Sequence, residues 1–374
     1  MGLRSGLPDF PWDTLTPYGA IARRHPDGIV DLSVGSPVDP TPESVRRALA
    51  EAADAPGYPT THGSAELREA VSAWFARRRG VPGLDPGAVL ATMGSKEFVA
   101  WLPSLLGLGE GDVVVHPEIA YPTYDVGARL AGATPLPADD VAAWSDRPDV
   151  RLVWLNSPSN PTGAVLGVEQ LRAAVAAARR TGAVVASDEC YALLPWSEPW
   201  ATAGVPSILD PRVCDGDHAG LLAVHSLSKQ SNLAGYRSAF VAGDAALVSR
   251  LLEIRKHAGM MAPAPIQAAT AAALVDDEHV AAQRAVYGRR RRVLIGALEA
   301  SGLLVEDSAA GLYLWVRAPG AGQDCWQTVA DLAKLGILVA PGLFYGPSGA
   351  RHVRVSLTAN DEAIASAAMR LTGA

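Results

Sequence analysis

The sequence of 374 residues has no long hydrophobic run and only three cysteines. It contains no stretch of about 18 apolar residues, so we expect no membrane-spanning helix and no membrane partner. Its first residues lack the apolar stretch of a secretory signal. Cys190, Cys214 and Cys325 are widely spaced, as is typical of reduced cytosolic thiols and not of a disulfide framework or a zinc site. We therefore expect a cytoplasmic protein.

Charged residues are scarce as well, at 19% of the chain against about 25% in an average soluble domain. The 32 Lys and Arg against 39 Asp and Glu give a net charge of −7. The one basic block is the arginine run 289–292, which we interpret as a solvated helix face, so no nucleic-acid partner is expected. The eight histidines show no metal-ligand spacing, so no metal is expected either.

What the sequence does contain is enough apolar material, 49%, for a deep core. Its length predicts two or three domains, or one large lobe with a smaller one. Between about residues 85 and 245, short Val-, Leu- and Ala-rich runs alternate with segments of helical period. Runs in which apolar and polar residues hardly alternate are typical of strands buried on both faces of a largely parallel sheet. We predict strands over 112–116, 151–156, 183–188, 221–226 and 238–242. We predict helices over 64–79, 95–106 and 168–181.

The sequence pattern changes after residue 244, where the alternation of short apolar runs and helical segments ends. An Ala-rich helical region runs to about residue 300, and Pro263 and Pro265 are expected to divide it into two helices. Strands are then predicted over 311–316, 336–340 and 352–357. The sequence thus predicts an α/β fold: a large domain over 41–260 with a mostly parallel central sheet flanked by helices, and a smaller α+β domain formed by 1–40 and 261–374.

Polar side chains follow several of the predicted strands, where a parallel sheet places its ligands. Asn160 follows 151–156, Asp188 ends the strand 183–188 with Tyr191 three residues further on, and the turn Ser226-Leu-Ser228-Lys229 comes at the end of 221–226. A lysine in such a turn can form a Schiff base with an aldehyde cofactor, and a nearby aspartate can keep a pyridine nitrogen protonated. Hydroxyls and an arginine, here Arg237, can bind the cofactor's phosphate. Together these residues predict a pyridoxal 5'-phosphate site.

The ordered set Asn160-Pro-Thr-Gly, Asp188 with Tyr191, Ser226-x-Ser228-Lys229, Arg237 and Arg354 resembles the fold-type I, class I/II aminotransferases. The resemblance extends over nearly the whole chain, from residue 32 to Arg354. It implies a pyridoxal-phosphate-dependent homodimer with shared active sites, whose partners are small-molecule substrates, namely amino acids and 2-oxo acids.

The resemblance also implies a role for each matching residue. Lys229 would be the Schiff-base lysine and the base of the reaction, Asp188 would pair with the pyridinium nitrogen, and Tyr191 with Asn160 would bind the phenolic oxygen. Tyr121 would stack on the cofactor ring. The phosphate would be held by Gly94, Ser95, Lys96, Ser226, Ser228 and Arg237, and by Tyr58 of the neighbouring subunit. Arg354, with Gly35, Asn160 and Lys96 close by, would bind the substrate.

Each of these residues also has an ordinary interpretation. Lys229 is alternatively a surface lysine and Asp188 a helix N-cap. The remaining alternatives are a turn-forming Asn160, a core aromatic at Tyr121, a solvated Lys96, and an Arg354 paired with a structural acid.

Five stretches, 31–40, 120–132, 214–218, 255–261 and 311–315, are similar to actinobacterial N-succinyldiaminopimelate aminotransferases. This similarity implies amino transfer between glutamate/2-oxoglutarate and N-succinyl-LL-2,6-diaminopimelate/N-succinyl-2-amino-6-oxopimelate, in lysine and diaminopimelate biosynthesis. Both substrates carry extra carboxylates, for which the candidate cations are Lys96, Arg23, Arg24 and Lys256. Met260 and Met261 form either an adaptable pocket wall or part of the core.

Of three alternatives to this function, the first two remain open. The first is an aminotransferase of other specificity, or another pyridoxal enzyme on the same scaffold, such as a C–S lyase. The second is a non-enzymatic, aminotransferase-like ligand sensor. The third, a nicotinamide dehydrogenase, is disfavoured because residues 107–111 precede a strand instead of following one and do not form a dinucleotide fingerprint.

Overall fold

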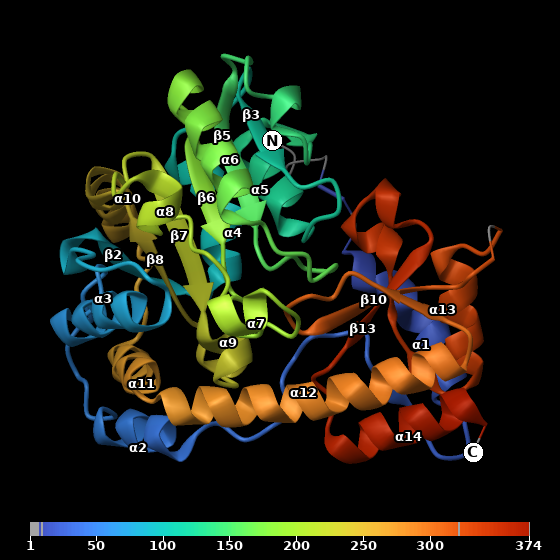
Figure 1. Ribbon diagram of the computed structural model, residues 1–374. Helices are drawn as coiled ribbons and strands as arrows, with labels where there is room; N and C mark the ends of the chain where they lie inside the picture. The colour runs from blue at the N-terminus through green and yellow to red at the C-terminus, as the bar shows by residue number, and fades with distance from the viewer. Residues whose placement is uncertain (1–6, 9, 321, 374) are drawn as a thin grey trace, which may run out of the picture.

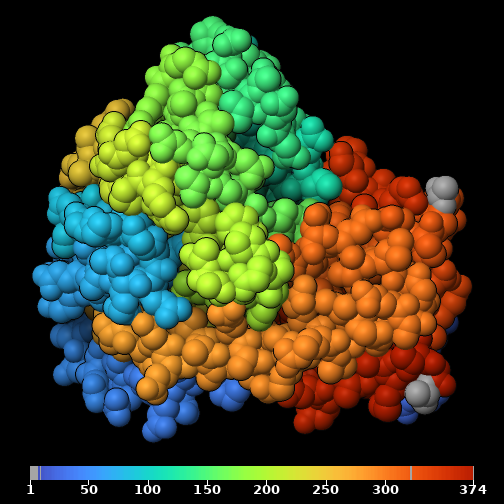
Figure 2. Space-filling model, in the orientation of Figure 1, coloured from blue at the N-terminus to red at the C-terminus, as the bar shows by residue number. Residues whose placement is uncertain are grey.

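The computed structural model describes residues 7–8, 10–320 and 322–373. Figure 1 shows a large sheet flanked by helices, a smaller sheet at the right, and the long helix α12 (Asp277–Ala300) running beneath both. In Figure 2 an orange surface crosses the lower part of the molecule, above the blue surface of the N-terminal part and the red surface of the C-terminal part. The boundaries of the two predicted domains stay a prediction.

The large sheet has seven strands in the order β2-β8-β7-β6-β5-β3-β4. Its strands are β2 (Val89–Met93), β3 (Val113–His116), β4 (Thr134–Pro137), β5 (Val150–Asn156), β6 (Val184–Asp188), β7 (Leu221–Ser226) and β8 (Ser238–Gly243). All neighbours pair in parallel except β8, which is antiparallel to both β7 and β2. The chain between β7 and β8 is too short for a full helical crossover, which explains the reversal.

The five strands predicted here are confirmed, and β2 and β4 were missed. β4 contains Pro135 and Pro137, which count against a strand. The two prolines are tolerated because β4 lies at the sheet edge and pairs only with β3, so fewer of its backbone N–H groups are needed for hydrogen bonds.

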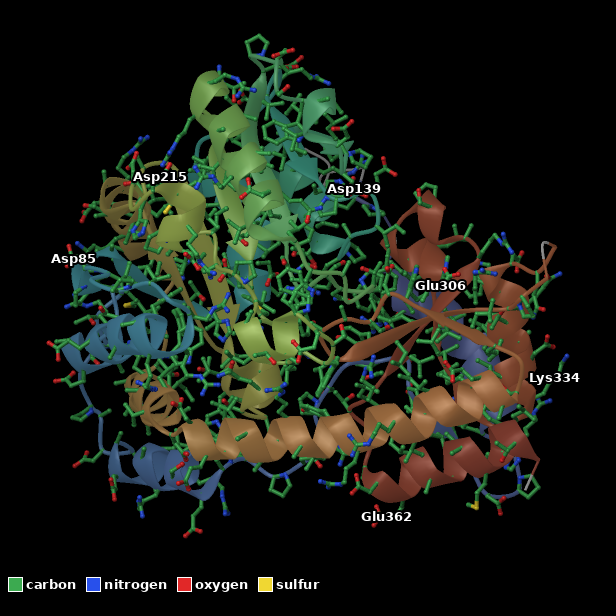
Figure 3. The ribbon with its side chains drawn as sticks, in the orientation of Figure 1. Asp85, Asp139, Asp215, Glu306, Lys334 and Glu362 are labelled. Atoms are coloured by element: carbon green, nitrogen blue, oxygen red, sulfur yellow. The ribbon has the colours of Figure 1, made fainter. Side chains whose placement is uncertain are left out.

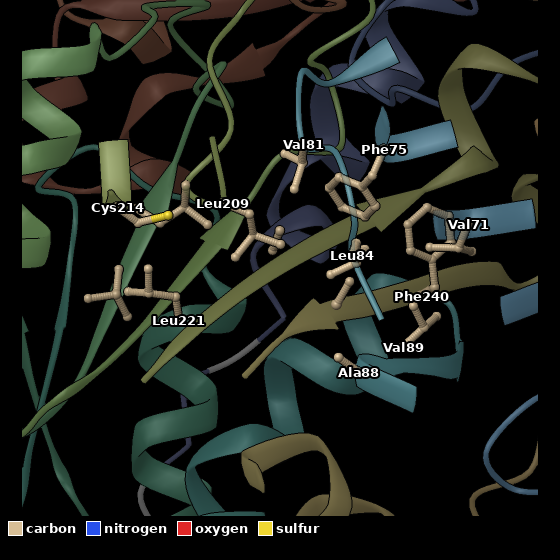
Figure 4. Packing of buried hydrophobic residues seen from close by; sticks show 14 of the residues in the cluster. Val71, Phe75, Val81, Leu84, Ala88, Val89, Leu209, Cys214, Leu221 and Phe240 are labelled. Atoms are coloured by element: carbon tan, nitrogen blue, oxygen red, sulfur yellow. The ribbon is translucent and has the colours of Figure 1, made fainter. Parts of the chain in front are cut away.

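Helices cover both faces of this sheet, because successive strand residues point to opposite sides. Val113 and Val115 pack into one buried cluster and Val114 into the other. The first face carries α3 (Ala65–Arg78), α6 (Val168–Thr181), α8 (Pro211–Cys214) and α11 (Ala264–Val275). The second carries α4 (Ser95–Leu105), α5 (Thr123–Ala131) and α10 (Ala245–Ala258). Figure 4 shows part of the first cluster, including Phe75 and Phe240.

The Ala-rich region forms three helices, α10, α11 and α12, so the prediction of two was wrong. The extra break falls at Asp276, whose side chain accepts hydrogen bonds from the backbone N–H groups of Glu278 and His279 and so caps α12. From the sequence we expect the helices to be interrupted only at prolines, whereas the second interruption is made by an aspartate that caps the next helix.

The interpretation of the arginine run 289–292 as a solvated face was wrong for Arg290. Its side chain is only 4% exposed and donates hydrogen bonds to Asp39 and Asp361. Arg289 and Arg292 are exposed. Consecutive arginines on a helix point in different directions, so one of them reaches the seam between α12 and the N-terminal segment.

The smaller sheet has the order β12-β13-β10-β9 and is antiparallel throughout. Its strands are β9 (Leu304–Glu306), β10 (Tyr313–Arg317), β12 (Ala340–Pro341) and β13 (His352–Ser356). A separate pair joins β1 (Val30–Asp31) to β11 (Ile337–Leu338). The predicted strand 336–340 is thus divided between two sheets.

Short and terminal helices complete the fold. They are α1 (Thr16–Ala22), α2 (Glu43–Glu51), α7 (Trp200–Ala203), α9 (Leu227–Gln230), α13 (Cys325–Lys334) and α14 (Asp361–Thr372). Exposed charged side chains such as Asp85, Asp215 and Glu362 lie at the periphery (Figure 3). Within residues 7–8, 10–320 and 322–373, no helix combines the length and apolarity that a membrane crossing requires.

Candidate active site

A cavity of about 710 Å³ lies at the carboxyl ends of β5, β6 and β7, where the sheet faces the N-terminal segment and β13. Most of the residues singled out from the sequence line it. They are Gly35, Ser95, Lys96, Tyr121, Asn160, Asp188, Tyr191, Ser226, Ser228, Lys229, Arg237 and Arg354. The strand ends thus converge as the parallel sheet predicts.

Lys229 projects from the short helix α9 at the end of β7. The Ser226 hydroxyl accepts a hydrogen bond from the Ser228 backbone N–H at 3.2 Å and so begins this helix. The Lys229 ammonium donates to the carbonyl of Gly35. Tyr287 of α12 donates to the Lys229 carbonyl at 3.1 Å. The lysine is therefore a cavity residue fixed from two sides, and its interpretation as a surface lysine does not hold.

Asp188 is buried at the end of β6. Its Oδ1 accepts from the backbone N–H of Cys190 at 3.2 Å, and its Oδ2 accepts from the Tyr124 hydroxyl at 2.9 Å. Burial raises the pKa of Asp188, although hydrogen bonds from Cys190 and Tyr124 oppose the rise. A cation placed opposite this carboxyl in the cavity would favour its ionised form. No helix begins at Asp188, so it is not a helix N-cap.

Arg237 lies directly over Gly94, the N-cap of α4. A Cβ at residue 94 would lie 2.1 Å from the Arg237 Nη2, so only glycine leaves room for the guanidinium. Ser95 begins α4, and the Ser226 and Ser228 hydroxyls are 2.9 Å apart nearby. Backbone N–H groups at a helix start, an arginine and hydroxyls are the groups that bind a phosphate.

Arg354 is 3% exposed and lies among aromatic rings. Its guanidinium carbon is 4.0 Å from the ring centroid of Tyr313. It donates to the Asn160 side-chain oxygen at 3.1 Å and to the Ser33 carbonyl at 2.6 Å. Asn160 in turn donates its backbone N–H to the Asn156 side chain at 2.8 Å, which ties this loop to β5.

Arg354 has no carboxylate partner in the described part of the chain, so its interpretation as half of a structural ion pair was wrong. Other buried arginines do have one: Arg79 pairs with Glu189, Arg255 with Glu97 and Arg290 with Asp39, all within 2.8 Å. A buried guanidinium without a counter-charge is costly unless an anion binds it. This arginine is therefore placed to bind a ligand carboxylate.

The cavity as a whole is short of negative charge. Lys96, Lys229, Arg237 and Arg354 line it, and Asp188 is the one carboxylate among its described lining residues. Among the ion pairs of residues 7–8, 10–320 and 322–373, none involves any of these four cations. The side chains present thus fit a ligand that carries a phosphate and at least one carboxylate, together with a cationic ring nitrogen opposite Asp188.

Not every predicted residue lies in the cavity. Tyr58 is 96% exposed and does not line it. Arg23, Arg24 and Lys256 do not line it either, so of the four candidate cations only Lys96 does. The Lys96 ammonium lies 5.7 Å from the Phe10 ring centroid and 5.9 Å from that of Tyr121. Met260 packs against the core cluster of α4, α5 and α10.

Sequence reasoning missed several lining residues: Phe10, Trp12, Tyr124, Cys190 and Tyr313. Tyr124 carried a usable signal, because it lies in the first turn of α5, three residues after Tyr121. Cys190 carried one as well, because it lies between the predicted site residues Asp188 and Tyr191. Phe10, Trp12 and Tyr313 carried no such signal, because they reach the cavity from the N-terminal segment and from the smaller sheet. In the described part of the chain, no cluster of His, Cys, Asp and Glu is arranged to hold a metal ion.

This fold and this site define a pyridoxal-phosphate-dependent transferase of fold type I. A family model described as aminotransferase class I and II matches residues 27–371, so the chain belongs to that family. Pyridoxal phosphate is accordingly its cofactor, and its activity is amino transfer between amino acids and oxo acids.

Similar proteins agree on the family and differ in their named substrates. A probable aminotransferase of Mycobacterium tuberculosis is 58% identical over 99% of this chain and 87% of its own length. The 4-dedimethylamino-4-oxo-anhydrotetracycline transaminase of Streptomyces rimosus is 56% identical over 98% of this chain and 99% of its own length. The structure of a probable N-succinyldiaminopimelate aminotransferase from Thermus thermophilus superposes with a TM-score of 0.86 at 30% identity, covering 97% of this chain and 100% of that one.

Proposed function

We propose that the protein transfers an amino group between glutamate/2-oxoglutarate and N-succinyl-LL-2,6-diaminopimelate/N-succinyl-2-amino-6-oxopimelate. The observation that carries this proposal is the charge distribution of the cavity. Beyond the cations suited to the cofactor and to one carboxylate, the cavity offers Lys96. The succinylated substrate has carboxylates beyond the one at its reacting end, and an ammonium can bind one of them. The name given to the Thermus thermophilus protein is consistent with this substrate.

The roles proposed for the residues follow from their positions. When bound, pyridoxal phosphate supplies an electron sink that makes the substrate Cα–H acidic. Lys229 holds the cofactor covalently and then moves the proton at the substrate Cα. Asp188 keeps the pyridine nitrogen protonated, and Tyr191 and Asn160 bind the phenolic oxygen. Tyr121 covers one ring face.

The remaining groups bind anions. Gly94, Ser95, Ser226, Ser228 and Arg237 hold the phosphate, and Arg354 binds the substrate α-carboxylate beside Gly35 and Asn160. We place Lys96 at the distal carboxylate. We also propose a homodimer in which the exposed Tyr58 reaches the phosphate of the second subunit.

The first experiment tests Lys229. Lys229→Ala is expected to abolish both turnover and the absorbance band of the covalent link between the lysine and the cofactor, because the covalent link and the proton carrier are the same nitrogen. Lys334→Ala is the matched control, since Lys334 is an exposed lysine of α13 that pairs with Asp331. A purified Lys229→Ala protein that still transaminates would refute the assignment.

The second experiment tests the substrate. With glutamate as donor, N-succinyl-2-amino-6-oxopimelate is compared with a monocarboxylic 2-oxo acid in the wild type and in Lys96→Gln. We expect the KM for the succinylated acceptor to rise about fivefold and that for the monocarboxylic acid to stay unchanged, since only the first loses a charge pair. If the wild type ignores the succinylated acceptor but uses another oxo acid, the substrate proposal falls and the aminotransferase activity stands.

A second candidate function is amino transfer to a bulky polycyclic oxo compound. The rings of Phe10, Trp12 and Tyr121 give the cavity a broad aromatic wall, and a Streptomyces rimosus relative at 56% identity is named for such a substrate. A tetracycline-type oxo acceptor therefore belongs in the same panel, and preference for it over the succinylated acid would favour this candidate.

A further inference from the structure

Two buried tyrosines meet inside the cavity. The hydroxyl oxygens of Tyr191, which follows β6, and Tyr313, on β10, lie 3.3 Å apart. Their rings are edge to face with centroids 5.8 Å apart. Both residues line the cavity. Tyr191 has a role in the proposed function, whereas nothing so far accounts for Tyr313.

The Tyr313 hydroxyl occupies a space that a side chain at residue 35 would fill. A Cβ on Gly35 would lie 2.1 Å from the Tyr313 oxygen, so the glycine is what lets the phenol approach. The carbonyl of the same Gly35 accepts the hydrogen bond of the Lys229 ammonium. Tyr313 therefore sits where the lysine, the N-terminal segment and Tyr191 come together.

The two phenols differ in their electrostatic surroundings. Burial raises the pKa of Tyr313, but the positive charges of Arg354 and Lys229 outweigh burial, and its net pKa lies below the ordinary value. Burial, with Tyr313 as a close neighbour, raises the pKa of Tyr191 well above the ordinary value. The other titratable groups near the pair, from the turn after β6, α12 and the loop after β12, are Asp188, Cys190, Tyr287 and Tyr345.

The direction of the hydrogen bond follows from the number of protons. The geometry allows either hydroxyl to donate, but Tyr191 has a single hydroxyl proton. In the proposed function Tyr191 donates that proton to the phenolic oxygen of the cofactor, so in its bond with Tyr313 it accepts and Tyr313 donates.

We propose that Tyr313 is a positioning residue: it donates its hydrogen bond to Tyr191 and thereby directs the Tyr191 hydroxyl proton toward the phenolic oxygen of the cofactor. The inference rests on the proposed function, in which Tyr191 binds that oxygen. When Tyr191 shares the negative charge of the oxygen, the oxygen attracts the proton on the neighbouring Lys229 nitrogen less strongly. Tyr313 thus helps to set the pH at which that nitrogen loses its proton.

The test uses the pH midpoint of the visible absorbance change of the cofactor-loaded protein, which reports protonation at the Lys229 nitrogen. Tyr313→Phe is expected to raise this midpoint by about half a pH unit, which is about a threefold change in the ionisation constant. A shift of this size is expected because the variant loses one hydrogen bond between neutral groups. Tyr191→Phe should raise it further. The double variant should match Tyr191→Phe alone, because Tyr313 acts through Tyr191.

Tyr345→Phe is the matched control. Tyr345 is also buried beside Arg354, at 5.0 Å from its guanidinium carbon, but its hydroxyl has no hydrogen-bond partner in the described structure. Its removal should leave the midpoint unchanged. Gly35→Ala is a second route, because it displaces the Tyr313 hydroxyl without deleting it, and should move the midpoint in the same direction.

A further readout needs no cofactor. In the cofactor-free protein, ultraviolet titration of tyrosinate should show one early-titrating phenol in the wild type that is missing in Tyr313→Phe. An unchanged midpoint in Tyr313→Phe, or a shift of equal size in the Tyr191→Phe background, would overturn the inference and leave the proposed function standing. Absence of any visible band in the loaded wild type would instead overturn the proposed function.

Discussion

The Tyr124 hydroxyl donates a 2.9 Å hydrogen bond to the buried Oδ2 of Asp188. The Tyr124 ring is fully buried and stacks on Trp154, with centroids 5.1 Å apart, so the hydroxyl is held in one position. The tyrosine therefore orients the carboxylate that faces the cavity and opposes the tendency of burial to neutralise it.

Tyr124→Phe is expected to weaken the hold of Asp188 on the cofactor nitrogen. The pKa of Asp188, already raised by burial, should rise further, because a donor that favours the ionised form is lost. We expect kcat to fall about tenfold, and the acid limb of the rate profile to move to higher pH. Steady-state kinetics over a pH series measure both effects.

The control for this prediction is Tyr18→Phe, which removes a hydroxyl from a ring stacked on Trp326 in the other part of the molecule. An acid limb that stays in place in Tyr124→Phe would contradict the role assigned to this hydrogen bond.

Gly94→Ala tests the contact between Arg237 and the start of α4. The new methyl would displace the guanidinium, since its carbon would lie 2.1 Å from Nη2. Loss of a charge-assisted hydrogen bond to the phosphate should weaken cofactor binding about tenfold or more, measured by spectroscopic titration of the cofactor-free protein.

Gly204→Ala separates this clash from backbone strain. Gly204 has φ 77° and ψ 160°, close to the φ 81° and ψ 151° of Gly94, but an added Cβ there would meet nothing within 4 Å. It should lose about 1 kcal/mol of stability and keep its cofactor affinity. Equal losses of affinity in the two variants would show that strain, not Arg237, is responsible.

Much of the sheet and of the site could be predicted from the sequence, because both depend on local patterns. The buried strands β5, β6 and β7 are largely apolar runs. Asp188 ends β6, Asn160 lies in the turn that follows β5, and Lys229 lies in the short helix α9 that follows β7. The parallel arrangement then brings these residues together without further information.

The residues that were missed depend on long-range contacts. Tyr313 reaches the cavity from the smaller sheet and Trp12 from the N-terminal segment. Whether the Arg354 guanidinium pairs with a carboxylate of the protein or is available to bind a ligand depends on which side chains surround it in space. A pattern along the chain reports which face a residue occupies, but not what lies opposite that face.

The two adjacent arginines of α12 offer a direct test of burial. Arg290 is 4% exposed and bonds to Asp39 and Asp361, whereas Arg289 is 54% exposed and lies 3.7 Å from Asp361. Arg290→Met leaves the half-buried Asp39 without its counter-charge and should lower the free energy of unfolding by about 2–3 kcal/mol. Arg289→Met should change it by less than about 0.5 kcal/mol. Urea unfolding of both variants measures the difference, and equal effects would contradict this account of the seam.

His225 should make the stability of the protein fall in acid. It is buried beside Trp74, with ring centroids 4.5 Å apart. Burial, and then the charge of Arg79, lower its pKa from 6.5 to about 4. Above pH 6.5 the ring is neutral in both the folded and the unfolded chain, so it adds no pH dependence there. As the pH falls from 6.5 to about 4, only the unfolded chain gains the proton, and folding loses up to about 3 kcal/mol.

His225→Asn should remove this loss. The asparagine amide can still donate to the Glu189 carbonyl, as the His225 Nδ1 does at 3.1 Å, but it has no titrating group. We expect the free energy of unfolding of the variant, measured with urea at neutral pH and at about pH 5, to fall less on acidification than that of the wild type. His257→Asn, which changes an exposed histidine at the end of α10, should keep the wild-type dependence. If His225→Asn lost as much stability in acid as the wild type, the acid sensitivity would come from other groups, and burial of neutral His225 would not be its cause.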